Sequence, residues 1–277
     1  MKARSKLVIH WSKRFQEGMG YVMLGRSERL EDLYITGNFD ASQIRCNKAA
    51  LEETERLHTE FESIKEEKES LFSNCFTISY LNVRSLNAHL EDVSTDQLLM
   101  YSDIISFGET WLKPDQNIDF EGFKGIQENV GQGKGIAAFI KTQYTMKCQK
   151  FKCDTFSAIF METEIIDVIF LYLSQRFSWT TLEEQFEKWI KSHKNVAVIG
   201  DMNIDFAEKQ HELTRYMHRN NFTQIIENPT HDAGGMLDHI YINDRLLHQK
   251  KPFCTQRSVY FSDHDIVVLH VPKDNKI

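Results

Sequence analysis

The stretch Val196-Ala-Val-Ile-Gly-Asp-Met-Asn-Ile-Asp205 decides how the rest of the chain is interpreted. Its first four residues are apolar and Gly200 follows them, which predicts a buried strand that ends in a loop. Asp201 and Asn203 are two positions apart, so in an extended chain their side chains point to the same side. A carboxylate beside an amide can take up a proton and donate a hydrogen bond to an anionic oxygen. The same residues also fit an Asx-type turn that closes the strand, and both interpretations stay open at this point.

The composition describes an ordinary globular protein. The 277 residues leave room for one large domain or for one domain with appendages, and 41% of them are hydrophobic while 26% are charged. The net charge of −7 argues against a protein that grips nucleic acid by bulk charge alone, although it leaves room for a local basic groove. Five cysteines without any C-x-x-C spacing are interpreted as reduced thiols, neither disulfides nor zinc ligands.

The hydropathy pattern gives no sign of a membrane protein or of a secreted one. No apolar run approaches the ~18 residues needed to cross a bilayer, and the N-terminus lacks the apolar core of a secretory signal. We therefore expect an intracellular protein, in the nucleus or the cytoplasm, without a membrane partner. The sequence predicts no particular protein partner.

The chain divides into three segments of different composition. Residues 1–46 begin with basic residues and predict a helix over 21–27 and a short strand over 33–36. Residues 47–74 are dense in Glu and Lys with sparse apolar positions, which predicts a charged, mostly solvated helical linker, ~40 Å long if unbroken. From 75 to 272 apolar runs and helical patterns alternate, which predicts one globular domain.

The pattern of this third segment predicts an α/β fold. Strands are expected at 76–81, 104–107, 135–140, 157–162, 165–173, 196–199, 240–242 and 266–271. Helices are expected at 96–101, 181–192 and 211–220, and Thr181-Leu-Glu-Glu184 has the pattern of a capping box at a helix start. Because helices fall singly between more numerous strands, we expect a two-layer β-sandwich flanked by helices, with a helical N-terminal extension.

The first segment resembles the C-terminal end of the DNA helicases that serve repair and of the related helicases of Helitron transposons. The resemblance rests on Gly20-Tyr-Val-Met-Leu-Gly-Arg26, Arg29-Leu-Glu-Asp-Leu-Tyr-Ile35 and Phe39-Asp-Ala-Ser-Gln-Ile-Arg45. In that family the arginine that matches Arg26 contacts nucleotide phosphates, but this chain has no G-x-x-x-x-G-K-[ST] loop, so neither motor activity nor a nucleotide cofactor is expected. A piece of ~40 residues buries too little apolar surface to fold alone. We interpret 1–46 as the remnant of a larger fused protein.

Polar residues follow the predicted strands at the points where those strands end. Beside Asp201 and Asn203, they are Asn82, Glu109, Tyr172, Asp238, Asp263 and His264. Taken alone, each has an ordinary structural interpretation: Asn82 can cap a turn, Glu109 can begin a surface helix, and Tyr172 can be a core residue whose hydroxyl finds a partner. Taken together, they suggest a shared site at one rim of the fold.

The order of the motifs that contain these residues resembles the endonuclease/exonuclease/phosphatase superfamily. The motifs are N-V-R-S-L, G-E-T-W-L, G-x-G-K-G, L-Y, G-D-M-N, L-D-H-I and S-D-H. The residues of these motifs are most similar to those of the apurinic-type endonuclease domains of LINE-type retrotransposons and of Helitrons. The resemblance runs from about Phe76 to Val271 and implies a DNase-like four-layer α/β sandwich. A helicase end followed by an endonuclease is itself the Helitron arrangement, so the two resemblances support each other.

The resemblance implies a Mg²⁺-dependent hydrolase of phosphodiester bonds that nicks DNA, with Mn²⁺ as an alternative ion. Glu109 would be the main metal ligand, and Asp263 would complete the acidic pocket. Mg²⁺ takes few protein carboxylates and keeps several waters, so a site built around one Glu is plausible. Arg84 stands where many apurinic endonucleases have a second acid, and it could instead pair with a DNA phosphate.

The resemblance also implies an acid–base role for part of the set. His264, oriented by Asp238, would hold the attack site or take up its proton, and Asp201 would position or activate the attacking water. The residues that would bind the phosphate through hydrogen bonds are Asn82, Asn203 and His264, with Tyr172 as a further donor. His231 is interpreted as a loop histidine, with a substrate contact as the alternative, and His239 as structural.

Two alternative functions stay open. The acidic net charge leaves room for a phosphatase or phosphodiesterase that acts on a lipid, a small molecule or a protein–nucleic acid adduct. A domesticated fragment that folds and only binds is favoured by the truncated helicase part and opposed by the intact set of catalytic positions. The domain is also compact, and we expect short DNA-gripping loops, which argues against damage-specific repair.

Overall fold

The computed structural model describes residues 6–11, 19, 24, 30–39, 72–174, 176–190, 195–207 and 211–273. The chain forms two compact units, Met1–Glu69 and Ser70–Ile277. None of the described helices is both long and apolar enough to cross a membrane.

The described part of the first unit contains a small parallel sheet. Strand β1 (Leu7–His10) pairs with β2 (Leu33–Thr36), and the 3-10 helix η1 (Leu30–Asp32) leads directly into β2. The strand predicted over 33–36 is confirmed, whereas its partner β1 was not predicted. The helices predicted over 21–27 and 47–74 fall almost wholly outside the described residues.

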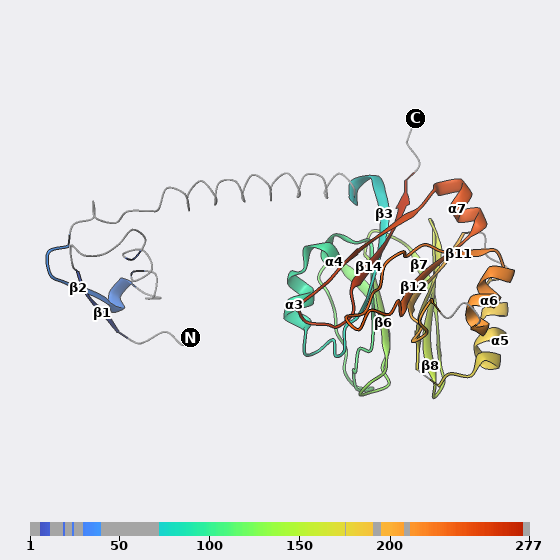
Figure 1. Ribbon diagram of the computed structural model, residues 1–277, viewed down its shortest axis with the longest axis horizontal. Helices are drawn as coiled ribbons and strands as arrows, with labels where there is room; N and C mark the ends of the chain where they lie inside the picture. Colours follow the sequence, from blue (N-terminus) through green and yellow to red (C-terminus); the bar gives the residue numbers. More distant parts are fainter. Residues whose placement is uncertain are drawn as a thin grey trace. The chain divides into compact units, whose positions relative to one another are not determined.

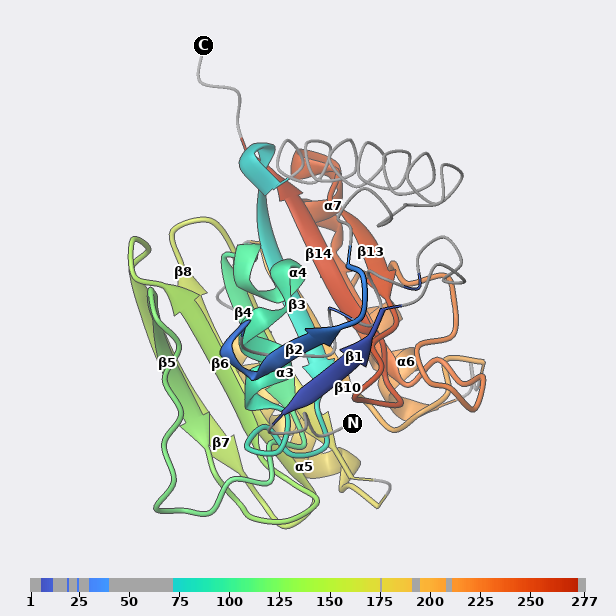
Figure 2. The ribbon, with the colours of Figure 1, turned by 90° about the vertical axis from the view of Figure 1, so that its left-hand side faces the viewer.

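The second unit contains two six-stranded sheets. The first has the order β13-β14-β3-β4-β6-β5, with β13 (Phe253–Arg257), β14 (Ile266–Pro272), β3 (Cys75–Asn82), β4 (Ile104–Gly108), β6 (Ile136–Lys141) and β5 (Phe123–Glu128). The second has the order β11-β12-β10-β9-β8-β7, with β11 (Phe222–Gln224), β12 (Asp238–Asn243), β10 (Val196–Asp201), β9 (Asp167–Leu173), β8 (Phe156–Thr163) and β7 (Met146–Lys152). In Figure 2, β14, β3, β4 and β6 lie side by side.

Helices cover the outer faces of both sheets. They are α3 (Leu90–Thr95), α4 (Gln97–Tyr101), α5 (Trp179–Ile190) and α6 (Glu212–Arg219). A further helix, α7 (Asp244–Lys250), follows β12 and buries Leu246 in the core between the sheets. Figure 1 shows α3 and α4 beside the first sheet and α5 and α6 beside the second. One apolar core lies between the sheets and one lies under each helix layer, for example around Leu99 of α4 and Phe186 of α5. The predicted β-sandwich flanked by helices, a four-layer α/β sandwich, is confirmed.

The central strands bring their carboxyl ends to one rim. In the first sheet β3 runs parallel to β4, and in the second β9 runs parallel to β10. Gly200 in β10 is required for the close approach of β9, because an added Cβ would lie 1.7 Å from the carbonyl oxygen of Leu171. This close pairing fixes the position of the next residue, Asp201, at the end of the strand.

The elements that the sequence failed to predict lie at the periphery. They are β5, β7, β11 and β13 at or near the sheet edges, and the short helices α3 and α7. The predicted capping box was wrong in position, because α5 begins at Trp179, before Thr181. The amide of Leu182 already bonds to the carbonyl of Ser178 at 3.2 Å, so the first helical turn is closed upstream of the expected start.

Candidate active site

Asn82, the last residue of β3, connects two carboxylates that belong to different sheets. Its amide nitrogen donates to Oε1 of Glu109 at 3.3 Å and to Oδ2 of Asp201 at 2.8 Å. Glu109 follows β4 in the first sheet, whereas Asp201 ends β10 in the second. A primary amide has two N–H groups, so this pair of bonds uses both of them. The predicted meeting of residues from distant strand ends therefore occurs, at the rim where the two sheets face each other.

Glu109 is half-buried and is held by neutral donors. Besides Asn82, the hydroxyl of Tyr172 donates to Oε1 at 3.2 Å and the indole nitrogen of Trp111 to Oε2 at 3.1 Å. Among the described residues no lysine or arginine forms an ion pair with this carboxylate. Burial, together with the charge of Glu109, raises the pKa of Tyr172, so its hydroxyl remains a donor. The negative charge of Glu109 is thus positioned without a cationic partner.

Tyr172 is a core residue whose hydroxyl finds partners at the site, and its predicted bond to the phosphate stays a prediction. The ring is 6% exposed and belongs to the core between the sheets, while the hydroxyl reaches Glu109 and the carbonyl of Gly133, each at 3.2 Å. Gly133 lies in the predicted turn between Gly131 and Gly135, where the amide of Lys134 bonds to the carbonyl of Gly131. A core tyrosine therefore ties this turn to the site carboxylate.

Asp201 forms the Asx-type turn and also accepts from Asn82 at the rim, while its catalytic role stays a prediction. Its Oδ1 accepts from the backbone amide of Asn203 at 2.8 Å, and the side-chain amide of Asn203 donates to the carbonyl of Leu173 at 2.6 Å. The carboxyl group is 1% exposed. Burial, and then the charge of Asp238, raise its pKa to about 7. Asp201 can therefore exchange a proton near neutral pH.

His264 and Asp238 form a buried pair, as predicted. Nδ1 of His264 lies 2.8 Å from Oδ2 of Asp238. Burial disfavours the charged ring, but Asp238, and then Asp201 and Asp263, outweigh it and raise the pKa of His264 to about 9. The ring is thus an imidazolium at neutral pH. Its Nδ1 is committed to Asp238, and Nε2 has no hydrogen-bond partner within the described part of the chain.

Asp263 lies in a different group from Glu109. Its Oδ2 accepts from the guanidinium of Arg84 and lies 3.4 Å from Nε2 of His231. The rings of His231 and His264 meet edge-on at 4.7 Å, and ligand atoms of His231, Asp263 and His264 all lie within 4.8 Å of one another. The structure therefore groups Asp263 with two histidines and an arginine, and its predicted ligand role beside Glu109 stays a prediction.

The backbone of the site loops is strained. Non-glycine residues with positive φ gather here: Arg84 (44°), Ser85 (101°), Glu109 (46°), Trp111 (55°) and Asn203 (48°). Such conformations are costly for residues with a Cβ, and they persist where the surroundings determine them, commonly at functional sites. The strained residues therefore lie in the same loops as the sequence motifs.

Three supporting residues were missed by the sequence interpretation. Ser262 donates to the carbonyl of Asn82 at 2.6 Å and accepts from the amide of His264 at 3.1 Å. Thr230 accepts from the amide of Asp238 at 3.0 Å, and Trp111 holds Glu109. The serine of S-D-H and the tryptophan of G-E-T-W-L were visible in the motifs, whereas nothing in the sequence singled out Thr230.

The residues around Glu109 fit a hard divalent cation. Mg²⁺ prefers oxygen ligands and retains several of its waters, so one well-placed carboxylate is a sufficient anchor. Glu109 has only neutral donors, and Oδ1 of Asp238 is buried without a hydrogen-bond partner among the described residues. A cation would supply the positive charge that this excess of carboxylate oxygens lacks.

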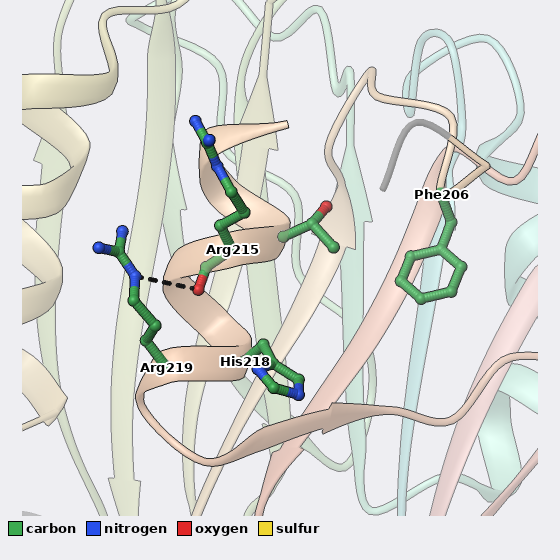
Figure 3. Close-up of a pocket in the computed structure, with 5 residues that line it drawn as sticks. Phe206, Arg215, His218 and Arg219 are labelled. Carbon is green, nitrogen blue, oxygen red and sulfur yellow. Dashed lines mark hydrogen bonds between the residues drawn. The ribbon is translucent and has the colours of Figure 1, made fainter. Parts of the chain in front are cut away.

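A separate hollow of about 650 Å³ lies on the helix side of the second sheet (Figure 3). It is lined by Phe206, Thr214, Arg215, His218 and Arg219, none of which belongs to the predicted site. Nε of Arg219 donates to the carbonyl of Arg215 at 3.3 Å. Basic residues in the last turn of a helix stabilise its C-terminus, which gives these side chains a structural role.

Comparisons with known proteins support the fold. No family model and no curated protein sequence matches the chain. The endonuclease domain of TRAS1, a telomere-specific non-LTR retrotransposon, matches with a TM-score of 0.55 at 14% identity, over 72% of this chain and 98% of that one. The AP endonuclease LMAP from Leishmania major matches with a TM-score of 0.55 at 12% identity, over 73% and 89% of the two chains.

A third solved structure, the 3′ phosphatase NExo from Neisseria bound to a product DNA hairpin, matches with a TM-score of 0.50 at 17% identity, over 72% of this chain and 100% of that one. At identities this low the likeness concerns the fold alone. The second unit of this chain therefore has the fold of endonuclease/exonuclease/phosphatase proteins, as its motifs predict.

Proposed function

We propose that residues 75–272 form a divalent-metal-dependent hydrolase that cleaves phosphodiester bonds and nicks DNA. The observation that carries this proposal is the bridge of Asn82 between Glu109 and Asp201, two carboxylates from different sheets. Asp201 in turn shares its surroundings with the Asp238–His264 pair. A metal anchor, a carboxyl group that titrates near neutral pH and a charged imidazole are together the groups that hydrolysis of a phosphodiester needs.

Glu109 would hold the ion, Mg²⁺ or Mn²⁺. A bound divalent ion polarises a phosphoryl oxygen and stabilises the charge that develops on the phosphate. The donors from Asn82, Tyr172 and Trp111 fix the orientation of the Glu109 carboxylate. Partners of this kind typically change metal affinity or activity by ~10–100-fold when they are removed.

Asp201 and His264 would carry out the proton and charge chemistry. With a pKa of about 7, Asp201 can accept a proton from the attacking water near neutral pH. His264, kept charged by Asp238, would donate through Nε2 to an oxygen of the phosphate. The buried pairing with Asp238 fixes which ring nitrogen remains available.

Asn82 and Asn203 would act first as positioning residues. Both N–H groups of Asn82 point to carboxylates, and the amide of Asn203 donates to the carbonyl of Leu173 and, at 3.4 Å, to Asp201. A phosphate oxygen has to replace one of these bonds before either amide can bind it. Their predicted phosphate-binding role thus requires an exchange of partners when substrate binds.

The residues of the motifs favour DNA as the substrate. Proteins of this fold include a retrotransposon endonuclease and an AP endonuclease. The proposed origin in a transposon, with 1–46 as a helicase remnant, rests on the motifs of the sequence. A DNA substrate fits the expected location in the nucleus or the cytoplasm.

A phosphatase acting on another phosphoester is the second candidate. The net charge of −7 favours it over a protein that binds DNA through bulk charge, and the same fold occurs in a 3′ phosphatase. The candidate site would serve both reactions, because each needs a metal anchor, a base and a phosphate-binding cation. The third candidate, a fragment that only binds, requires that this site be inert.

A nicking assay on supercoiled plasmid tests the proposal. We expect the purified full chain to convert supercoiled to open-circular DNA with Mg²⁺ and to stop when EDTA is added. Asp201→Asn and His264→Ala should each remove the activity, while His218→Ala, an exposed histidine on α6, should retain it. Turnover of a small phosphoester without nicking would instead support the phosphatase. Equal activity in all variants would identify a contaminant and favour the binding fragment.

A further inference from the structure

Arg84 is fixed at the rim by the same residues that build the proposed metal site. It follows β3 in a left-handed backbone conformation, with φ of 44°. Its backbone amide donates to Oδ1 of Asn82 at 3.3 Å, and the amide of the next residue, Ser85, donates to the carbonyl of Glu109 at 2.9 Å. The start of this side chain is therefore held between the ends of β3 and β4.

The guanidinium of Arg84 pairs with Oδ2 of Asp263. Its positive charge also acts on Tyr172, whose pKa it lowers against burial and the charge of Glu109, which raise it. The side chain of Arg84 remains 50% exposed, so part of its five N–H donors face solvent. Arg84 thus holds Asp263 and remains half open to solvent at the rim.

His231 strengthens this arrangement because its tautomer is fixed. The backbone amide of Ala233 donates to Nδ1 of His231 at 2.9 Å, and a backbone amide can only donate. In the neutral ring the proton must therefore sit on Nε2, which faces Oδ2 of Asp263 at 3.4 Å. Asp263 Oδ2 thus accepts a hydrogen bond from Arg84 and has the Nε2–H side of His231 3.4 Å away, which leaves this oxygen poorly suited to a cation.

We propose that Arg84, anchored by Asp263 and His231, binds the phosphate of the substrate in the place of a second divalent cation, so that the site takes a single ion at Glu109. The substrate part of this inference rests on the proposed function. A guanidinium presents several donors in one plane and matches phosphate oxygens. Its fixed charge beside Asp263 also repels a second cation. Asp263 then acts as an anchor for Arg84 instead of as a metal ligand.

Titration of the metal-free full chain with Mn²⁺, without DNA, tests the single-ion part. We expect one tightly bound ion per chain, followed by calorimetry or by the electron paramagnetic resonance signal of free Mn²⁺. Glu109→Gln should weaken binding by more than about 10-fold, as for loss of a group that determines the ion site, while Asp263→Asn should change it by less than about 3-fold. Two ions in the wild type, or equal weakening by both variants, would overturn the inference. This readout needs no catalysis, so it is independent of the proposed function.

The salt dependence of DNA binding tests the phosphate part. In an Asp201→Asn background, which prevents cleavage, the affinity for a DNA duplex is measured over a range of NaCl concentrations. Removing one phosphate contact should reduce the slope of log K against log [NaCl] by about 0.9. We expect that reduction for Arg84→Asn, since asparagine tolerates positive φ, and none for Arg219→Asn, an arginine in the last turn of α6 on the helix side of the second sheet.

An unchanged slope in Arg84→Asn would overturn the phosphate role of Arg84. Complete absence of DNA binding by the parent variant would refute the DNA substrate, and with it this role, while the single-ion result would stand. Circular dichroism of each variant distinguishes loss of a contact from loss of the fold.

Discussion

Strand β3 has buried carboxylates near both of its ends, and the hydrogen-bond donors and cations around these carboxylates differ between the two ends. Near the start, Asp103 accepts from the backbone amide and the hydroxyl of Thr77 at 3.0 and 3.3 Å and from the hydroxyl of Tyr144 at 3.1 Å. The ammonium of Lys141 lies 3.6 Å away. This carboxylate has donors for both oxygens and a cation beside it, which is what a stable buried charge requires.

The other end of β3 has an excess of carboxylates. Glu109 and Asp201 accept only from neutral donors, the imidazolium of His264 is hydrogen-bonded to Asp238, and Oδ1 of Asp238 has no hydrogen-bond partner among the described residues. The difference shows where the fold satisfies its own charges and where it leaves them for something else. An end that is short of positive charge is suited to bind a cation and a phosphate.

The histidines at the two ends differ in the same way. His270, which pairs with Thr77 across β14 and β3, has no carboxylate partner, and burial lowers its pKa to about 4. His264 at the site end has a pKa raised to about 9 by Asp238, in spite of burial. The structural end keeps its histidine neutral, whereas the site end keeps its histidine charged.

The largest expected effect is a difference in nicking rate between substitutions at the two ends of β3. Asp201→Asn should reduce the nicking rate by roughly 10²–10⁴-fold, because it removes the group that accepts the proton. Asp103→Asn should leave the rate within about 2-fold, since no proposed step involves this end. Single-turnover nicking kinetics measure both, and comparable losses in the two variants would erase the functional difference between the ends.

Addition of Mg²⁺ should stabilise the protein through the site end only. At a concentration 100 times the dissociation constant, the ion should add about 2.7 kcal/mol to the free energy of unfolding. The expected result is a higher Tm for the wild type and for Asp103→Asn, and no change for Glu109→Gln. Differential scanning calorimetry with and without EDTA checks this. An equal rise of Tm in Glu109→Gln would show that the ion binds elsewhere.

Asp103 should matter for stability. Asp103→Asn replaces one acceptor oxygen by a donor and removes the partner of Lys141, so we expect a loss of about 1–3 kcal/mol in the free energy of unfolding. Urea denaturation measures this loss. A variant as stable as the wild type would mean that the hydrogen bonds around Asp103 contribute little.

The effect of pH is the smallest for a single step of one pH unit, since each titrating group then changes the free energy of unfolding by at most about 1.4 kcal/mol. In the metal-free protein the raised pKa values of Asp201 (from 3.8 to about 7) and His264 (from 6.5 to about 9) give stability at low pH, which is lost as the pH rises from 3.8 to about 7 for Asp201 and from 6.5 to about 9 for His264. The lowered pKa of His270 (from 6.5 to about 4) gives stability above pH 6.5 that is lost as the pH falls towards 4.

Substitutions at the two ends of β3 should separate the contributions of these histidines to a plot of Tm against pH. Asp238→Asn should flatten the alkaline limb of a plot of Tm against pH, and His270→Gln should flatten the acidic limb. A plot in which Asp238→Asn changes only the acidic limb would contradict the assignment of the charged histidine to the site.

The parts of the fold that could be predicted are those buried on both faces. The central strands β3, β4, β9, β10 and β14 are near-continuous apolar runs because each is covered by a core on either side. Strands β5, β7 and β13 lie at sheet edges, where exposed and half-buried residues are mixed and no period stands out. Edge strands are specified by their neighbours, which a local pattern does not contain.

The membership of the site could be predicted from the motifs, while its pairings could not. The order of strand ends identifies Asn82, Asp201 and His264 as neighbours once the sheets are assumed to face each other. Which amide bridges which acids depends on the register between the sheets and on loops with positive φ. For the same reason the pairing of Arg84 with Asp263, 179 positions away, left no trace in the sequence.

The position of a bound Mn²⁺ tests the central claim most directly. Anomalous diffraction from crystals of the full chain soaked in Mn²⁺ should show one peak against the carboxylate of Glu109. A peak between His231, Asp263 and His264 in place of the one at Glu109 would contradict the account. So would the absence of a peak at Glu109 in crystals whose protein nicks DNA with Mn²⁺ in solution.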